Sequence, residues 1–129
     1  MRINGEWLVD SGNRRLFFRG VNLSGNAKLP LTPYQPTRTR EGYFDYKKVS
    51  FVGRPFPLSS AKSHFQRLKS WGFNFLRFCV TWEALEPHEP GKYDHEYMDY
   101  VVQVLKVARE VGFKAFIDPH QDCVRLFLL

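Results

Sequence analysis

The order of apolar and polar residues predicts helices and buried strands that alternate along the chain. Residues 73–80 and 113–118 are apolar runs of strand length, and each follows a stretch with apolar residues at helical spacing. The two helical stripes are Ala61, Phe65, Leu68 and Trp71, and Tyr97, Val101, Val104, Leu105, Ala108 and Val111. Helix, glycine and apolar strand therefore occur twice, which predicts parallel strands joined by helical crossovers.

Residues that favour helix ends and turns set the expected bounds. Ser59 or Ser60 can cap the first helix and Asp94 the second, and a glycine follows each stripe. Before the first helix, residues 3–9 and 15–23 predict two strands joined by a turn at residues 10–13. The early part of the second strand could belong to a hairpin and the later part to the core, and the sequence leaves that division open.

Residues 25–58 show neither a helical nor a strand period. Five prolines and six aromatic residues occur between residues 25 and 58. Connections of this length are generally functional or disordered, and the aromatic content favours an ordered lid. A variable insertion without a role is the alternative.

Composition and charge indicate one globular domain and narrow the range of partners. The chain has 129 residues and a net charge of +6, with 13 Lys and Arg against 4 Asp and Glu in residues 1–69. The basic residues are scattered, so nucleic-acid binding is the weakest of the functions considered, and we expect no nucleic-acid partner. Cys79 is expected to pack as a small hydrophobe. The two cysteines lack metal-site spacing, so we expect neither a metal nor another cofactor.

No targeting or membrane segment is evident. The first 25 residues lack the apolar core of a signal peptide, and no stretch approaches the roughly 20 apolar residues of a membrane span. We therefore expect a cytoplasmic protein, and the sequence leaves its oligomeric state open.

Polar residues stand where the predicted strands end. The three ends read Asn22-Leu23-Ser24, Thr81-Trp82-Glu83 and His120-Gln121-Asp122. In parallel α/β folds the chemistry is found at these carboxyl ends. A charge inside an apolar strand is costly unless it is paired, so Arg77 lies either on an edge strand or against a carboxylate in a polar pocket. We favour the pocket, with the guanidinium aimed toward the third strand end.

The third strand end offers an imidazole, an amide and a carboxylate, a set that suits sugar hydroxyls. His120 could instead have a structural role, and a metal pair of His120 with Asp122 lacks a third ligand nearby. Trp82 could stack on a pyranose ring or pack as an ordinary tryptophan.

The acidic residues near the second strand end are candidates for chemistry. Glycoside hydrolysis usually requires two carboxylates, about 5–5.5 Å apart in retaining enzymes. Glu83 is the acid placed to react from the second strand, and Asp122 could be its partner, although the surrounding residues do not support these roles. Glu86 and Glu89 flank prolines and are expected to face solvent.

Three motifs make the chain similar to the N-terminal part of glycoside hydrolase family 5, a (β/α)8-barrel family. The motifs are FRGVNL at residues 18–23, GFNFLR at 72–77 with WEALEP at 82–87, and DPHQD at 118–122. Within the family, the chain most resembles the endoglycoceramidase-related branch, with its fungal glucosylceramidases and steryl-β-glucosidases. The resemblance implies an α/β fold: about three βα units of a TIM barrel, preceded by an N-terminal β-hairpin.

The expected domain organisation follows from this resemblance. The segments are a hairpin and first strand at 1–23, a long loop at 24–58, two helix-strand units at 59–122 and an apolar tail at 123–129.

The resemblance also implies an activity and a role for several residues. It implies a retaining β-glucosidase that hydrolyses O-glycosyl bonds of glucosylated lipids, with peripheral membrane contact through the lipid substrate. Arg77 would orient the nucleophilic glutamate, and His120 would line the pocket for the terminal sugar. Asp122 and Lys28 would bind that sugar, and Trp82 is a candidate from its position alone.

The chain departs from the family pattern in its last part. The two catalytic glutamates of the family follow strands four and seven, and this chain contains no Asn-Glu pair. Residues 123–129 are apolar where the family continues into a polar loop. We therefore expect a truncated product, with a catalytically inactive fragment or a sugar-binding piece as the alternative function. Alone it should be poorly stable, because residues 73–80 and 113–117 would meet water.

Overall fold

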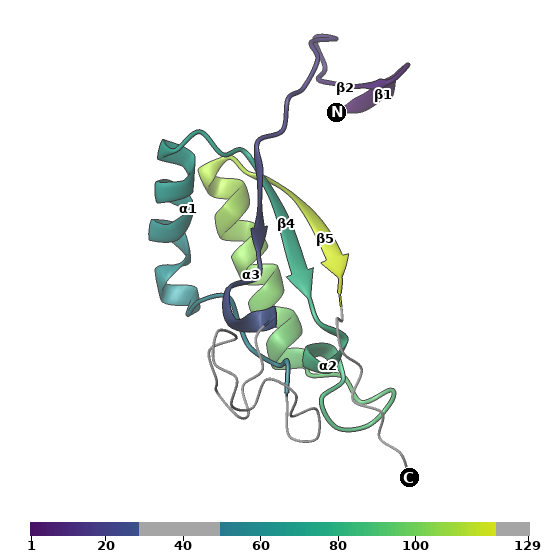
Figure 1. The fold of residues 1–129 in the computed structure, drawn as a ribbon, viewed down its shortest axis with the longest axis vertical. Helices are drawn as coiled ribbons and strands as arrows, with labels where there is room; N and C mark the ends of the chain where they lie inside the picture. Colours follow the sequence, from purple (N-terminus) through teal and green to yellow (C-terminus); the bar gives the residue numbers. More distant parts are fainter. Residues whose placement is uncertain (29–49, 121–129) are drawn as a thin grey trace, which may run out of the picture.

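The computed structural model describes residues 1–28 and 50–120, which form a parallel sheet backed by helices (Figure 1). The three strands lie in the order β3-β4-β5 and comprise Gly20–Leu23, Phe75–Val80 and Lys114–Pro119. The helices are α1 (Ala61–Ser70), α2 (Trp82–Leu85) and α3 (His95–Val111), with short 3-10 helices η1 (Gly25–Lys28) and η2 (Leu58–Ser60). Neighbouring parallel strands joined through helices form the α/β arrangement that begins a (β/α)8 barrel, as predicted.

The two long helices begin and end close to their predicted bounds. The Asp94 carboxylate caps α3 by accepting a hydrogen bond from the Tyr97 amide at 2.9 Å, and α3 ends at Gly112 with φ of 92°. The Ser60 hydroxyl precedes α1 but donates to the Pro57 carbonyl at 2.9 Å instead of capping the helix.

The apolar stripes of α1 and α3 pack into the core, with one exception. The stripe residues buried in this core are Ala61, Phe65, Tyr97, Val101, Val104 and Ala108, and they cover Leu76, Phe78 and Val80 of β4. Trp71 was predicted on the α1 stripe, but its side chain is 64% exposed. Because α1 ends at Ser70 and the chain turns at Gly72, with φ of 87°, Trp71 leaves the helical face.

The prediction for the N-terminal strands was partly wrong. A hairpin forms from β1 (Arg2–Asn4) and β2 (Trp7–Val9), so it lies almost wholly inside the stretch predicted as a single strand. Gly5, with φ of 60°, makes this tight turn possible, and the Asn4-Gly5 dipeptide was the sequence signal for it. In Figure 1 the hairpin lies beyond the amino-terminal ends of the parallel strands.

The predicted turn at residues 10–13 is present and leads back to the hairpin. The Asp10 carboxylate accepts hydrogen bonds from the amides of Gly12 and Arg14 at 2.9 and 3.0 Å. Arg15 then forms a single antiparallel bridge with Val9. The structure thus resolves the division of residues 15–23: their start belongs to the hairpin side, and their end is β3.

Asn74 joins the amino-terminal ends of all three parallel strands. Its side chain accepts a hydrogen bond from the Arg19 amide at 2.8 Å and donates one to the Phe17 carbonyl at 3.0 Å. Its backbone carbonyl accepts from the Lys114 amide at 3.1 Å. These bonds fix the register of the three strands. The register in turn decides which side chains meet at the carboxyl ends of the strands.

The expected exposure of the strands is confirmed for one of them. β5 is the last strand of the described sheet, and its Phe116 and Ile117 are 54% and 48% exposed. The expectation was wrong for Leu76 and Phe78 of β4, which are fully buried because α1 and α3 cover that face of the strand.

Some expectations fall outside the described residues. These are the tail at 123–129, Asp122 and most of the long loop. Across residues 1–28 and 50–120, no helix has both the length and the apolar character needed to cross a membrane.

Candidate active site

The face of the sheet opposite the helices carries polar side chains from all three strands. Side chains alternate along a strand, and the even-numbered residues of β4 pack into the helix-covered core, so Arg77 and Cys79 lie on the other face. The register pairs Asn22 with Arg77 and Cys79 with Asp118. Paired residues share a face, so Asn22, Arg77 and Asp118 come together on it. Cys79 is fully buried, as expected of a small hydrophobe.

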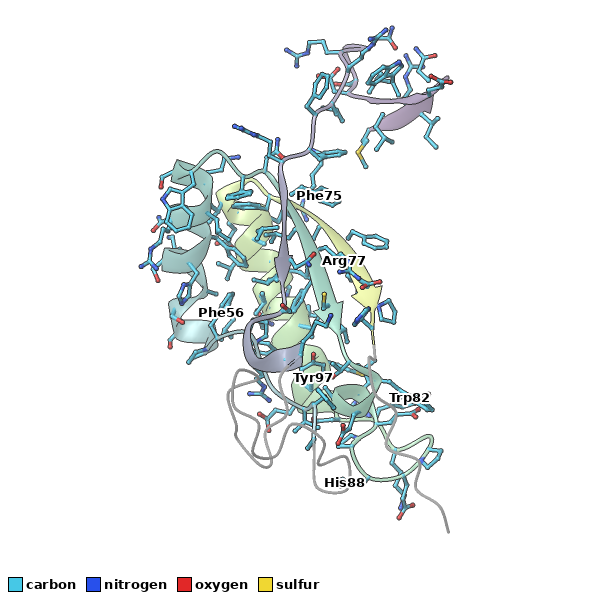
Figure 2. The ribbon with its side chains drawn as sticks, viewed as in Figure 1. Phe56, Phe75, Arg77, Trp82, His88 and Tyr97 are labelled. Carbon is cyan, nitrogen blue, oxygen red and sulfur yellow. The ribbon has the colours of Figure 1, made fainter. Side chains whose placement is uncertain are left out.

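Arg77 is the centre of this polar cluster (Figure 2). Its Nη2 atom lies 2.5 Å from Oδ2 of Asp118, and its Nη1 donates to Oδ1 of Asn22 at 3.4 Å. Its Nη2 also lies 3.4 Å from Nδ1 of His120, which is 3.5 Å from the same Asp118 oxygen. The guanidinium therefore points toward His120, as predicted.

The environment of Arg77 answers the question raised by a charge inside an apolar strand. β4 is the central strand of the described sheet, and the guanidinium is paired with a carboxylate. The Arg77 side chain remains 36% exposed and that of Asp118 19% exposed. Pairing and partial hydration together offset the cost of placing the charge there. The prediction that Arg77 meets a carboxylate is confirmed, and the edge-strand alternative is wrong for the described sheet.

Sequence reasoning missed Asp118 as a member of the site. This residue contacts both Arg77 and His120, yet it was counted only as the end of the third strand and the first residue of the DPHQD motif, with no role in the site. A carboxylate closing an apolar run was the available signal. Its partner could not be read from the sequence, because the pairing depends on the register between β4 and β5.

Lys28 and Trp82 lie on short helices next to the strand ends. Lys28 is the last residue of η1, which follows β3 directly and contacts β4, and its side chain is half-buried. Trp82 is the first residue of α2 and is 54% exposed. Its indole Nε1 donates to Oε2 of Glu86 at 2.7 Å, which fixes the ring against its own helix (Figure 2).

The acidic residues after β4 have different surroundings from those expected. Glu86 is half-buried and accepts hydrogen bonds from the Trp82 indole and from the Gly91 amide at 3.3 Å, so the expectation that it faces solvent was wrong. Glu89 is exposed, as expected, and pairs with Lys92 at 2.6 Å. The carboxylate of Glu83 accepts the Phe51 amide hydrogen at 2.9 Å.

The chemistry that this cluster can perform is recognition and charge placement. Asn22, Arg77 and His120 supply nitrogen and oxygen atoms for hydrogen bonds, and Arg77 supplies a positive charge held by Asp118. Within the part of the chain that the structure describes, no three His, Cys, Asp or Glu side chains are grouped as metal ligands.

Parallel strands joined by helices, with polar side chains at their carboxyl ends, have the arrangement of the opening part of a (β/α)8 barrel. A sequence model of one such family, Cellulase (glycosyl hydrolase family 5), matches residues 35–126. The chain belongs to glycosyl hydrolase family 5.

Known relatives place the chain more closely within this family. It is 47% identical to the glucosylceramidase of Aspergillus fumigatus over 122 residues, which cover 95% of this chain and 16% of the relative. It matches the crystal structure of Cryptococcus neoformans sterylglucosidase 1 with tris at a TM-score of 0.67 and 45% identity, covering 88% of this chain and 16% of that one.

A more distant match is the complex of Rhodococcus sp. endo-glycoceramidase II with ganglioside GM3. Its TM-score is 0.60 at 28% identity, over 92% of this chain and 21% of that one. The chain spans about one sixth of the length of the curated relatives it matches.

Proposed function

We propose that this chain forms the first strands of the catalytic barrel of a retaining β-glucosidase acting on glucosylated lipids, either glucosylceramide or a steryl glucoside. The observation that carries the proposal is the polar cluster of Asn22, Arg77, Asp118 and His120, where three parallel strands end. The names of the relatives support the substrate class, because they are a glucosylceramidase and a sterylglucosidase.

The cluster would prepare the site for a carboxylate nucleophile. Retaining hydrolysis uses one carboxylate that attacks the sugar and a second that donates and then accepts a proton. Arg77 would donate a hydrogen bond to the nucleophile and keep it ionised and aligned. Asp118 and Asn22 hold the guanidinium in position for this, at 2.5 and 3.4 Å. Fixed charges placed before the reaction lower the barrier without reorganisation.

The remaining residues would bind the terminal glucose. His120, whose Nδ1 lies near Arg77 and Asp118, would bind a sugar hydroxyl through its imidazole. Lys28 and Asp122 would bind further hydroxyls, and the exposed indole of Trp82 would stack on the apolar face of a pyranose. Because the aglycone is a lipid, the complete enzyme would meet its substrate at a membrane surface.

A second candidate is a catalytically inactive or sugar-binding piece. The absence of an Asn-Glu pair from the 129 residues favours it for the chain taken by itself. Incubation of the purified chain with glucosylceramide and with a steryl glucoside distinguishes the two. Release of glucose would contradict the second candidate.

A chimera tests the first candidate directly. Residues 1–120 would replace the matching segment of Cryptococcus neoformans sterylglucosidase 1, which supplies the rest of the barrel. We expect glucose release from a steryl glucoside by the chimera.

In this chimera, Arg77→Ala should lower kcat by about 100- to 1,000-fold with KM nearly unchanged, since removal of one preorganised hydrogen-bond donor has an effect of that size. Arg77→Lys keeps the positive charge but lacks the planar guanidinium, whose nitrogen atoms can bond to two partners at once. This variant is expected to recover only part of the kcat that Arg77→Ala loses. An Arg77→Ala chimera with unchanged kcat would contradict the proposed role.

A further inference from the structure

Phe51 is held by two side chains that follow β4. The Thr81 hydroxyl donates to the Phe51 carbonyl at 2.6 Å and accepts from the Ala84 amide at 3.3 Å. The carboxylate of Glu83 accepts the Phe51 amide hydrogen at 2.9 Å. Both backbone polar groups of one residue are thus bound by side chains about thirty positions away in sequence.

The contacts around Phe51 extend into a small packed unit, residues 51–56, that we call the neck. Val52 and Phe56 pack against the core. Arg54 pairs with Glu96 at 2.7 Å, and the Phe56 carbonyl accepts from the Tyr100 hydroxyl at 2.6 Å. The neck is therefore fastened to α3 as well as to the end of β4.

The neck in turn supports η1, the short helix that ends at Lys28. Gly25 lies directly against Pro55: a Cβ atom there would be 2.6 Å from the Pro55 carbonyl oxygen and 2.8 Å from its Cα. Ala27 of η1 is fully buried. A shift of the neck would therefore move η1, and with it Lys28.

We propose that Glu83 is a positioning residue: with Thr81 it fastens the neck to the end of β4 and so holds η1 and Lys28 beside the sugar site. This inference deepens the proposed function and rests on it. It assigns Glu83 a different role from the reacting acid considered from sequence. Its half-buried carboxylate accepts a backbone amide hydrogen and so helps to hold the backbone of Phe51 in place.

Matched substitutions in the chimera separate positioning from proton transfer. Glu83→Gln keeps an oxygen that can accept the Phe51 amide hydrogen, whereas Glu83→Ala removes it. We expect Glu83→Ala to raise KM at least about fivefold, with kcat within about threefold, and Glu83→Gln to restore most of KM. Thr81→Ser and Thr81→Val form an equivalent pair for the other bond. Glu89→Ala, which removes an exposed carboxylate from the segment after α2, is the control and should change neither constant.

Hydrogen exchange gives a readout that does not depend on activity. Loss of a hydrogen bond to a charged group should speed exchange in a peptide covering residues 50–56 by about 10- to 100-fold in Glu83→Ala, and much less in Glu83→Gln. The measurement would use both the full 129-residue chain and the chimera.

The possible results separate the two proposals. An inactive unsubstituted chimera would count against the glycosidase assignment, while the exchange data would still decide the role of Glu83. Equal kcat losses in Glu83→Gln and Glu83→Ala would overturn the inference in favour of proton transfer. Unchanged exchange and KM in Glu83→Ala would also overturn it.

Discussion

The Nη2 atom of Arg77 lies 2.5 Å from Oδ2 of Asp118, across two neighbouring parallel strands. The two residues are 41 positions apart in the sequence. Asp118 pairs in the sheet with Cys79, two residues beyond Arg77, so the long arginine side chain reaches forward along β4 to the carboxylate. The guanidinium is thereby held at the carboxyl ends of the strands, where a substrate would bind.

Neutralising Asp118 should weaken the proposed function of Arg77. In the chimera, Asp118→Asn keeps the shape of the side chain but removes the charge that holds the guanidinium. Loss of a partly buried ion pair is expected to lower kcat by about 10- to 100-fold. Steady-state kinetics on a steryl glucoside measure this. Asp99→Asn, which neutralises an exposed carboxylate of α3, serves as the control. Equal kinetics in both variants would show that Asp118 does not act on Arg77.

Two neighbouring tyrosines of α3 should respond in opposite ways to loss of their hydroxyls. The hydroxyl of Tyr97 is buried and has no hydrogen-bond partner among the described residues, whereas that of Tyr100 donates to the Phe56 carbonyl. Tyr97→Phe should leave the free energy of unfolding unchanged or raise it slightly, and Tyr100→Phe should lower it by about 1 kcal/mol. Urea unfolding of the chimera measures both. A larger loss in Tyr97→Phe than in Tyr100→Phe would contradict this assignment.

Tyr97 should also make stability fall in strong alkali. Burial raises the pKa of Tyr97 from its ordinary value of 10.0 to about 12. Between these values the unfolded chain loses the tyrosine proton and the folded one keeps it, so stability decreases as the pH rises. The contribution of Tyr97 to the free energy of unfolding is fully present below pH 10 and is lost by about pH 12. Tyr97→Phe should flatten the fall in urea midpoint between pH 9 and pH 11.5, and an identical fall in both proteins would disprove the account.

A methyl group at Gly25 should disturb the neck and η1. Gly25 has φ of 45° and would place a Cβ atom against the Pro55 backbone, so Gly25→Ala adds a clash to the backbone strain. Gly91 also has a positive φ, of 80°, but a Cβ atom there would meet nothing within 4 Å. We expect Gly91→Ala to cost about 1 kcal/mol of stability and Gly25→Ala clearly more, together with a rise in KM. Equal losses in the two variants would show that contact with Pro55 does not matter.

The main helices and strands could be predicted from the sequence because their signals are local. The stripe on α3, the Asp94 cap and the stop at Gly112 all involve residues within a few turns of one another. The N-terminal hairpin was misplaced because the strong turn signal at residues 10–13 outweighed the Asn4-Gly5 dipeptide.

What the sequence by itself determined was the alternation of helix and parallel strand, and a family membership carried by three short motifs. The structure alone decided which side chains meet: that Asp118 is the partner of Arg77, that Glu83 holds Phe51, and that Glu86 is tied to Trp82. Periodicity reports which face of an element is apolar. Contacts between strands depend on register and on the path of the connecting chain, and these are settled only when the whole sheet packs.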